Sequence, residues 1–297
     1  MAAAAITAIA CAAPAANATS PSSTASATSA THGQHGGNRH HASALPHFDH
    51  VVIVMDENHE QGQIIGSPDA PYINSLAKGG ANFTQSYAIT HPSQPNYLAL
   101  FSGSTQGVTS DACPQSFSAD NLGNQLRTAN LSFTGYSEDI PSAGSSTCTS
   151  GDYARKHVPW SNFTDLPQSE VSLPYTSFPS DSTGYAKLPT VSWVVPNLQD
   201  DMHDGTVAQG DTWLKNNIDG YAQWAKANNS LLIVTFDEDD SAGANQIPTL
   251  FYGAHVAAGD DSTKINHYTV LRTLEDMYGL PALGSAAGET AIGDCWD

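Results

Sequence analysis

The chain is poor in basic residues and in long apolar runs, and each shortage excludes a class of protein. Only 10 of its 297 residues are Lys or Arg, against 29 Asp and Glu, which gives a formal net charge of −19. A chain this acidic repels phosphate backbones and anionic lipids, so it is unsuited to binding nucleic acid or to holding a membrane by charge alone. No apolar run reaches the roughly 18 residues of a transmembrane helix, so we expect no stable membrane insertion.

Cysteine is also scarce, with only four in the chain. Cys113 and Cys148 each stand beside loops rich in Gly and Ser, where a disulfide could form in an oxidising compartment. Cys11 lies in the small-residue N-terminal segment, so Cys295 would be left unpaired.

The first 46 residues do not have the composition of a folded domain. Residues 1–18 are small and apolar and end in an A-x-A cleavage pattern, which predicts a signal-like segment and a secreted protein, although the usual positive charge at the start is missing. Residues 19–46 are rich in Ser, Thr, His and Gly, which predicts a disordered linker and favours a solvated tail over a His-rich metal site. Residues 47–297 are then expected to form a single domain, long enough for one core.

Strands and helices alternate along this predicted domain. Continuous apolar, β-branched runs predict buried strands of a parallel sheet at 51–55, 190–195 and 231–236. Amphipathic segments predict helices at 69–79, where Asp69 would cap the first turn, at 208–227, and at 267–278, where Gly279 would end the helix. Further expected elements are helices at 96–101 and 121–129 and strands at 131–136 and 247–252. This order predicts an α/β fold, with a doubly wound, mostly parallel sheet flanked by helices.

Acidic side chains follow three of the predicted strands where each strand ends. The stretches are Asp56-Glu57-Asn58, Asp237-Glu238-Asp239-Asp240 and Asp200-Asp201-Met202-His203-Asp204. Ligands of open α/β sheets bind beyond the carboxyl ends of the strands, so we expect these side chains to meet. Carboxylates that cluster repel one another unless a cation lies among them, and their oxygens suit Ca²⁺, Mg²⁺ or Mn²⁺, while the added imidazoles admit Zn²⁺ or Fe. The alternative for any single acidic pair is a helix cap or a solvated turn.

A candidate nucleophile lies in the segment THPSQPNYLALFSG, residues 90–103. Ser93 stands between Pro92 and Pro95, just before a helical segment whose N-terminal N–H groups favour a phosphoryl oxygen. A metal or a base must activate such a hydroxyl, and Asn96 can donate to a phosphate oxygen. The alternative is that Ser93 only caps the helix.

Two of the ten basic residues are adjacent, at Arg155 and Lys156, and His157 follows them. A lysine or arginine neutralises phosphate charge, and a histidine can donate to phosphate or protonate a leaving group. The alternative is an ordinary exposed pair. His267, which opens the last predicted helix, is either a supporting residue of the site or a structural histidine.

Taken together, these motifs resemble those of the phosphoesterase family of phospholipases C and acid phosphatases, which has the alkaline-phosphatase-like fold. The resemblance covers nearly the whole region from residue 45 to the predicted C-terminal helix, and residues 47–297 would form the catalytic domain. The similar stretches are HVVIVMDEN (50–58), APYINSLA (70–77), THPSQPNYLALFSG (90–103), YARKHVPW (153–160), DMHDGTVAQGDTWL (201–214), NNSLLIVTFDEDD (228–240) and IPTLFYGAHV (247–256).

The resemblance implies a metal-dependent phosphomonoesterase, or acid phosphatase, that works through a phosphoserine intermediate. The implied ligands of a divalent metal, whether Ca, Mg, Mn or Zn, are Glu57, Asn58, Ser93, Asp237 and Glu238. The implied catalytic residues are the nucleophile Ser93 and, near the leaving group, His203. The implied substrate-binding residues are Asn96, Lys156, His157 and Asp204. The substrate would be a small phosphomonoester or a phospholipid headgroup, including phosphoinositides, and we expect a monomer.

One departure bears on the choice of reaction. The phospholipase branch continues its late motif as DEHGGFFDH, whereas residues 237–245 read DEDDSAGAN, without the His and the Gly pair. This difference favours a phosphatase over the second hypothesis, a phospholipase C or phosphodiesterase that uses the same metal site. A third hypothesis, of another class, is an extracellular calcium-binding or adhesion domain without catalysis.

Overall fold

The computed structural model describes residues 45–297. The predicted signal-like segment 1–18 and the linker 19–46, except its last two residues, therefore lie outside the described residues. Of those two, Leu45 packs against the hydrophobic core.

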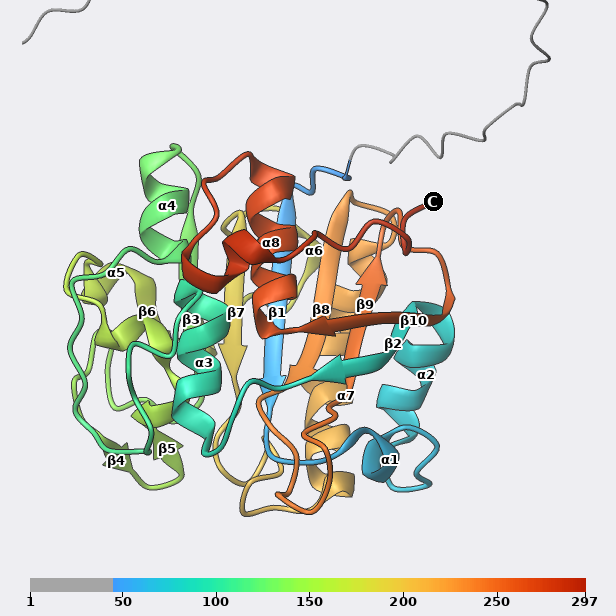
Figure 1. Cartoon of the computed structure of the whole chain (residues 1–297), viewed down its shortest axis with the longest axis horizontal. Coiled ribbons are helices and arrows are strands. Elements are labelled where there is room, and N and C mark those ends of the chain that lie inside the picture. The colour runs from blue at the N-terminus through green and yellow to red at the C-terminus, as the bar shows by residue number, and fades with distance from the viewer. Residues whose placement is uncertain (1–44) are drawn as a thin grey trace, which may run out of the picture. The chain divides into compact units, whose positions relative to one another are not determined.

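One large sheet organises the described chain. Its strands are β1 (His50–Asp56), β2 (Ala81–Tyr87), β3 (Phe133–Ser137), β6 (Ser172–Pro174), β7 (Val191–Val195), β8 (Ser230–Phe236), β9 (Thr249–Gly253) and β10 (Gly259–Asn266). Their order is β10-β2-β9-β8-β1-β7-β3-β6 (Figure 1). All neighbouring pairs are parallel except the two that β9 makes with β8 and β2. The predicted mostly parallel sheet is confirmed.

The central strand β1 is buried on both faces of the sheet. Val51, Ile53 and Met55 belong to the hydrophobic cluster on one face, and Val52 and Val54 belong to the cluster on the other. Because successive side chains of a strand point to opposite faces, a strand covered on both sides has to be apolar throughout.

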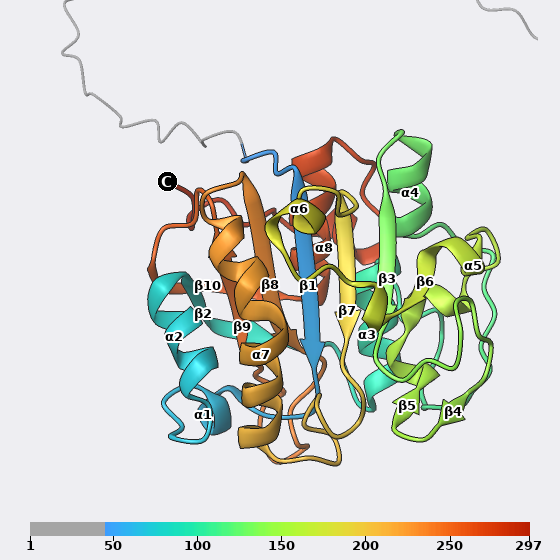
Figure 2. The ribbon, with the colours of Figure 1, turned by 180° about the vertical axis from the view of Figure 1, so that it is seen from behind.

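Helices cover both faces of the sheet. The longer ones are α2 (Pro71–Gly79), α3 (Ser93–Ser102), α4 (Leu122–Thr128), α7 (Val207–Ala225) and α8 (His267–Tyr278). Figure 1 shows α3, α4 and α8 in front of the sheet, and Figure 2 shows α7 on the opposite face. The shorter elements are α1 (Gln61–Ile64), α5 (Gln168–Val171), α6 (Ser182–Tyr185), η1 (Arg155–His157), η2 (Pro159–Asn162), η3 (Tyr175–Ser177), η4 (Gly284–Gly288) and the hairpin strands β4 (Thr149–Ser150) and β5 (Tyr153–Ala154). The doubly wound α/β fold is confirmed.

The start of α2 differs from the expectation. The residue before its first turn is Ala70, and the prediction that Asp69 caps this helix is wrong. The N–H groups of Tyr72 and Ile73 are instead accepted by the carboxylate of Asp211, which reaches them from α7 (3.0 and 2.8 Å). A capping partner distant in sequence satisfies these donors as well as a local one does.

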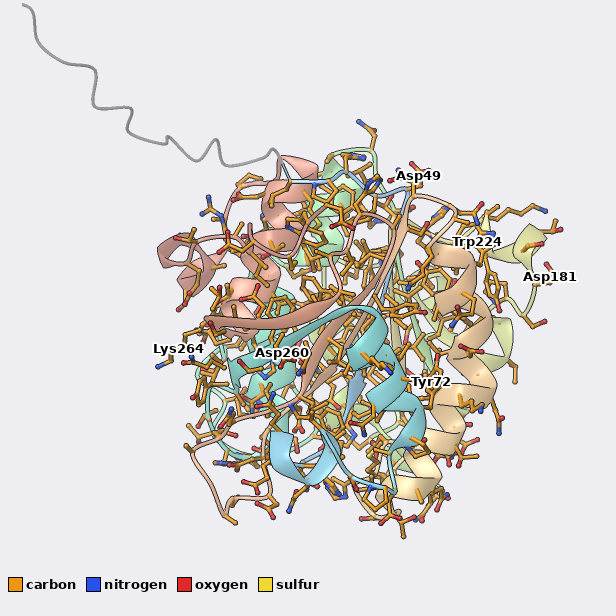
Figure 3. The ribbon with its side chains drawn as sticks, turned by 90° about the vertical axis from the view of Figure 1, so that its right-hand side faces the viewer. Asp49, Tyr72, Asp181, Trp224, Asp260 and Lys264 are labelled. Carbon is orange, nitrogen blue, oxygen red and sulfur yellow. A yellow bond between two sulfur atoms is a disulfide. The ribbon has the colours of Figure 1, made fainter. Side chains whose placement is uncertain are left out.

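Three strands of the sheet, β2, β6 and β10, were not expected from the sequence. β6 is only three residues long (SLP), and the other two, ANFTQSY and GDDSTKIN, lack a continuous apolar run. β10 lies at the edge of the sheet, where Asp260 and Lys264 are exposed (Figure 3). Charged side chains suit such an edge because they discourage pairing with another chain.

Cys113 and Cys148 form a disulfide, as their positions allowed. Cys295 is buried and unpaired within residues 45–297. None of the helices in that range has the length and apolar character needed to span a bilayer.

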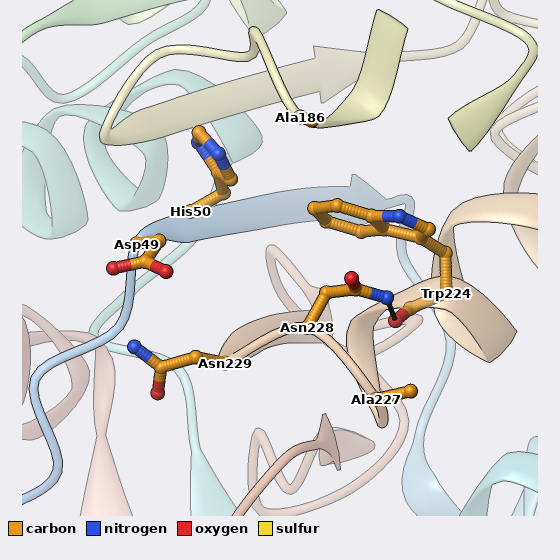
Figure 4. A pocket seen from close by; sticks show the side chains of 7 residues that line it. All are labelled: Asp49, His50, Ala186, Trp224, Ala227, Asn228 and Asn229. Atoms are coloured by element: carbon orange, nitrogen blue, oxygen red, sulfur yellow. Dashed lines mark hydrogen bonds between the residues drawn. The ribbon is translucent and has the colours of Figure 1, made fainter. Parts of the chain in front are cut away.

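A cavity of about 370 Å³ lies at the amino end of β1 (Figure 4). His50, the first residue of that strand, and Trp224, near the end of α7, both line it. The predicted site residues follow the opposite, carboxyl ends of the strands, so none of them lines this cavity.

Glu275, in α8, is buried in surroundings that favour its neutral form. Its Oε1 accepts the N–H of Leu283 (2.8 Å), whereas its Oε2 has no hydrogen-bond partner among the residues described. Burial raises the pKa of Glu275 from 4.5 to about 7. The folded state therefore binds this proton more tightly than the unfolded chain does, and the free energy of unfolding falls as pH rises from about 4.5 to about 7.

Replacing Glu275 by Gln keeps the acceptor for Leu283 and removes the buried charge. We expect Glu275→Gln to raise the free energy of unfolding by about 1–2 kcal/mol at pH 8 and by little at pH 5. The gain is less than the pKa shift alone implies, because the new NH₂ group takes the place of Oε2, which has no hydrogen-bond partner among the residues described. Urea unfolding of both proteins at the two pH values measures this. An equal difference at both would contradict the assignment to Glu275.

Candidate active site

The carboxyl ends of the parallel strands β1 and β8 bring three carboxylates to one serine. Glu57 follows β1, and Asp237 and Glu238 follow β8. The Ser93 hydroxyl donates to Glu57 Oε2 (3.0 Å) and lies 3.4 Å from Glu238 Oε1. The predicted convergence of these segments at one sheet edge is therefore present in the structure.

Ser93 is the first residue of α3 and is only 2% exposed. The residue before the helix is Pro92, which has no side-chain group that could cap it, and the N–H of Gln94 in the first turn donates to Asp111 Oδ1 (3.0 Å). Since the Ser93 hydroxyl donates to a carboxylate and does not accept from the helix backbone, the alternative in which Ser93 only caps the helix is wrong. The helix begins three residues earlier than expected, because Pro95 lies in the first turn, where an N–H has no partner inside the helix.

Asp237 is a buried carboxylate with spare acceptor capacity. Its Oδ1 accepts the backbone N–H of Asn58 (3.0 Å), and its Oδ2 has no hydrogen-bond partner among residues 45–297. Burial, reinforced by the charges of Glu57 and Glu238, raises the pKa of Asp237 well above its usual range. Burial and the charge of Glu57 likewise raise the pKa of Glu238 to about 8. A cation among these oxygens would relieve both effects.

Glu57 is held by an aromatic hydroxyl and an imidazole. The Tyr97 hydroxyl donates to Glu57 Oε1 (2.5 Å), and His157 Nε2 lies 3.0 Å from the same oxygen. Burial alone would raise the pKa of Glu57, but His157 and the Tyr97 hydrogen bond lower it to about 2. Burial alone would lower the pKa of His157, but the charges of Glu57 and Asp201 raise it to about 9.

Asp201 joins three segments of the site and was not among the predicted site residues. Its Oδ2 lies 3.2 Å from His157 Nδ1, and its Oδ1 accepts the backbone N–H of His203 (2.8 Å). Its backbone carbonyl accepts the N–H of Glu57 (2.8 Å). The sequence signal for Asp201 was its position two residues before His203 in the same acidic stretch. A comparable signal existed for Tyr97, which lies one helical turn after Ser93 and so on the same side of the helix.

Lys156 lies in a line of polar side chains at the mouth of the site. Its Nζ donates to Asp111 Oδ2 (3.0 Å) and lies 3.1 Å from His203 Nε2. His203 Nδ1 lies 2.8 Å from Asp204 Oδ1. These contacts place Nδ1–H on His203, because Nε2 faces a donor. Burial lowers the pKa of Lys156, but the charges of Glu57 and Asp111 more than offset this and raise it.

Asn96 is placed next to Glu238 but holds the loop that precedes the serine. Its Oδ1 accepts the N–H groups of Ile89 and Thr90 (3.0 and 3.1 Å), and its Nδ2 lies 3.5 Å from Glu238 Oε2. His91, another residue that the sequence reasoning missed, places Nδ1 2.8 Å from the same oxygen. The role of Asn96 toward phosphate stays a prediction.

His267 supports the end of β8. Its Nε2 lies 2.7 Å from the backbone carbonyl of Asp237, and burial lowers the pKa of His267 to about 4. A neutral His267 that donates to this carbonyl orients the strand end without contributing charge.

The residues around Glu57 are suited to a divalent metal. Among the residues described, Glu57, His157 and His203 offer one ligand atom each, all within 4.8 Å of one another. This group shares only Glu57 with the set that the sequence predicted. The unpartnered Oδ2 of Asp237 favours a different position for the metal, on the side of Glu57 where the oxygens of Ser93 and Glu238 also lie.

Known proteins of similar sequence indicate the family of the chain. Residues 67–281 match the Phosphoesterase family. Over 256 residues the chain is 55% identical to the phosphatidylinositol-3-phosphatase of Mycobacterium tuberculosis, a match that covers 86% of this chain and 85% of that protein. It is 30% identical to an acid phosphatase of Aspergillus fumigatus over 70% of this chain, and the match spans 51% of the fungal enzyme's length.

Solved structures show the same fold. A protein of the alkaline phosphatase superfamily from Vibrio parahaemolyticus superposes with a TM-score of 0.56 at 15% identity, over 84% of this chain and 72% of that one. The lipoteichoic acid synthase LtaP from Listeria monocytogenes gives 0.57 at 10% identity, over 86% and 80%. The fold is that of the alkaline phosphatase superfamily, and the match of 215 consecutive positions, residues 67–281, shows that the chain belongs to the phosphoesterase family, whose members hydrolyse phosphate esters.

Proposed function

We propose that this phosphoesterase is a secreted, metal-dependent phosphomonoesterase, an acid phosphatase that works through a phosphoserine at position 93. The observation that carries the proposal is the buried Ser93 hydroxyl, held between Glu57 and Glu238 at the start of α3. The N-terminal end of this helix favours the negative charge of a phosphoryl group. Export is supported by the A-x-A pattern and by the Cys113–Cys148 disulfide.

The oxygens that would hold the divalent cation belong to Glu57, Ser93, Asp237 and Glu238, with Asn58 included because of the family resemblance. When bound, the cation supplies positive charge that favours the alkoxide form of the hydroxyl and neutralises phosphoryl oxygens. Asp237 is the residue most dependent on it, because its Oδ2 is buried without a partner in the described chain.

The chain's own groups account for the remaining chemistry. The Ser93 Oγ loses its proton and forms a bond to phosphorus while the bond from phosphorus to the alcohol oxygen breaks. The alcohol oxygen gains a proton as it leaves, so the step neither consumes nor releases a proton overall. Water then attacks the phosphoserine, which releases phosphate and restores the hydroxyl. The Lys156 ammonium stabilises the charge that develops on the phosphoryl oxygens. His203, which lies beside Lys156, is placed near the alcohol oxygen of the leaving group.

The relatives and one loop support the proposed substrate class. The name of the mycobacterial relative, a phosphatidylinositol-3-phosphatase, supports a phosphoinositide, and the name acid phosphatase of the fungal relative supports phosphate monoesters in general. The sequence DEDDSAGAN at 237–245 supports a monoesterase over the alternative, a phospholipase C or phosphodiesterase on the same site.

Removing the Ser93 hydroxyl should abolish turnover. We expect Ser93→Ala to lower kcat for p-nitrophenyl phosphate by about 10³-fold or more, because the nucleophile is lost. Ser102→Ala, at the other end of the same buried helix, is the matched control and should stay active. Acid-quenched parent enzyme should contain phosphoserine at position 93 by mass spectrometry. A Ser93→Ala protein with most of its activity would rule out the serine mechanism.

Removing the metal should also stop the reaction. After dialysis against a chelator we expect at least a tenfold loss of kcat/KM, restored by one of Ca²⁺, Mg²⁺, Mn²⁺ or Zn²⁺. Asp237→Asn should lower the metal content measured by mass spectrometry, whereas Asp260→Asn, on the edge strand β10, should not. Full activity in protein shown to be free of metal would contradict metal dependence.

A substrate panel separates the two reaction classes. We expect kcat/KM to be at least tenfold higher for p-nitrophenyl phosphate and for phosphatidylinositol 3-phosphate than for bis-p-nitrophenyl phosphate or phosphatidylcholine. The reason is that a site that stabilises a dianionic phosphoryl group binds the singly charged phosphate of a diester less well. Release of phosphate and of the alcohol is measured for each compound. A preference for the two diesters would establish the alternative function.

A further inference from the structure

The position of Lys156 is set by two side chains from different parts of the chain. Its Nζ donates to Asp111 Oδ2 (3.0 Å) and faces His203 Nε2 (3.1 Å). A lysine ammonium has three protons, and these two contacts use two of them. These two contacts fix the rotation of the ammonium group and so the direction of its third N–H. That N–H is the one available to a phosphoryl oxygen.

Asp111 also contacts the nucleophile's own helix. Its Oδ1 accepts the backbone N–H of Gln94, the residue that follows Ser93 (3.0 Å). The Gln94 side chain in turn donates to the backbone carbonyls of Ser110 and Ala112 (3.0 Å each). The Asp111 carboxylate therefore joins the start of α3 to the Lys156 ammonium. The hydrogen bonds from Gln94 also hold the loop that carries Asp111 against the same helix.

The two segments that meet at this contact are cross-linked behind it. Cys113, two residues after Asp111, is bonded to Cys148. Arg155 is 7% exposed, and its side chain donates to the backbone carbonyls of Ser146 and Ser161 (3.0 and 2.7 Å). The backbone N–H of Arg155 donates to the backbone carbonyl of Cys148 (2.9 Å). Asp111 is thus mounted on a braced loop, which limits the positions that its carboxylate can take.

We propose that Asp111 is a positioning residue for phosphoryl transfer, which fixes the Lys156 ammonium relative to Ser93. The inference rests on the proposed function, in which Lys156 stabilises the phosphoryl group. A free lysine side chain has about 2 kcal/mol of rotamer entropy, so an unanchored ammonium would meet the phosphoryl group less often in the productive geometry. The side chains of Lys156 and Asp111 are 19% and 30% exposed, and ion pairs this close to solvent contribute little to stability, so the effect should be in catalysis.

The substitution Asp111→Asn isolates this contact. The amide oxygen can still accept the N–H of Gln94, while the NH₂ group that replaces Oδ2 is a donor and cannot accept from Lys156. The start of α3 is thereby preserved and only the link to the ammonium is removed. Asp152→Asn is the matched control, because it removes one exposed carboxylate four residues before Lys156 without a contact to it among the described side-chain hydrogen bonds.

The experiment is a double-mutant cycle in kcat and KM for p-nitrophenyl phosphate on the full chain. It uses the parent protein, Asp111→Asn, Lys156→Met and the double variant. We expect Asp111→Asn to lower kcat/KM about tenfold and Lys156→Met about 10²-fold, with the double variant no worse than Lys156→Met alone. Asp152→Asn should leave kcat/KM within about twofold, and the melting temperatures of the single variants should match that of the parent within a few degrees.

Three results would overturn the proposal. Losses that multiply in the double variant would show that Asp111 acts independently of Lys156. Unchanged kcat/KM in Asp111→Asn would show that the ammonium needs no anchor. Unchanged kcat/KM in Lys156→Met would remove the role of the lysine itself; this result leaves the serine mechanism intact, since that mechanism is tested separately by Ser93→Ala and the phosphoserine.

Discussion

The structure depends on the burial of like charges at one edge of the sheet. Glu57, Asp237 and Glu238 approach a single hydroxyl in a region from which water is largely excluded. Carboxylates in such a place are unfavourable unless hydrogen bonds, cationic side chains or a metal compensate them. Much of the surrounding polar structure serves as that compensation.

The compensation is unequal, and the inequality gives the carboxylates different properties. Glu57 receives a tyrosine hydroxyl and an imidazole, so it remains a carboxylate at any ordinary pH. Among residues 45–297, Asp237 accepts one backbone N–H at Oδ1, and its Oδ2 has no hydrogen-bond partner. The described part of the chain satisfies Glu57, whereas Oδ2 of Asp237 remains available to a bound cation. This division of roles is typical of sites where the fold supplies part of a coordination shell.

Sequence reasoning located the strands that are covered on both faces, because burial forces a continuous apolar run. It therefore also located the residues at their carboxyl ends, including Glu57 and Asp237. It missed β6, which has only three residues, and β2 and β10, whose polar sequences form strands because neighbouring strands pair with them. It placed Asp201 in an acidic stretch without giving it a role, and it missed Tyr97 and Asp111, for a related reason. Each acts on a partner at least 40 positions away, as with Asp201 and His157 at 44, and no local pattern records such a contact.

The pairing of β1 with β8 has a consequence for how the enzyme is made. All seven residues of β1 are matched to β8, and the groups that come after them, Asn58 and Asp237, are 179 positions apart. A slip of one residue would displace the two ends by about 3.3 Å and turn every side chain to the wrong face. Contacts between such remote segments form late and slowly during folding. A nascent chain that has not yet reached residue 238 lacks Asp237 and Glu238, so the complete acidic cluster can assemble only after β8 has been synthesised.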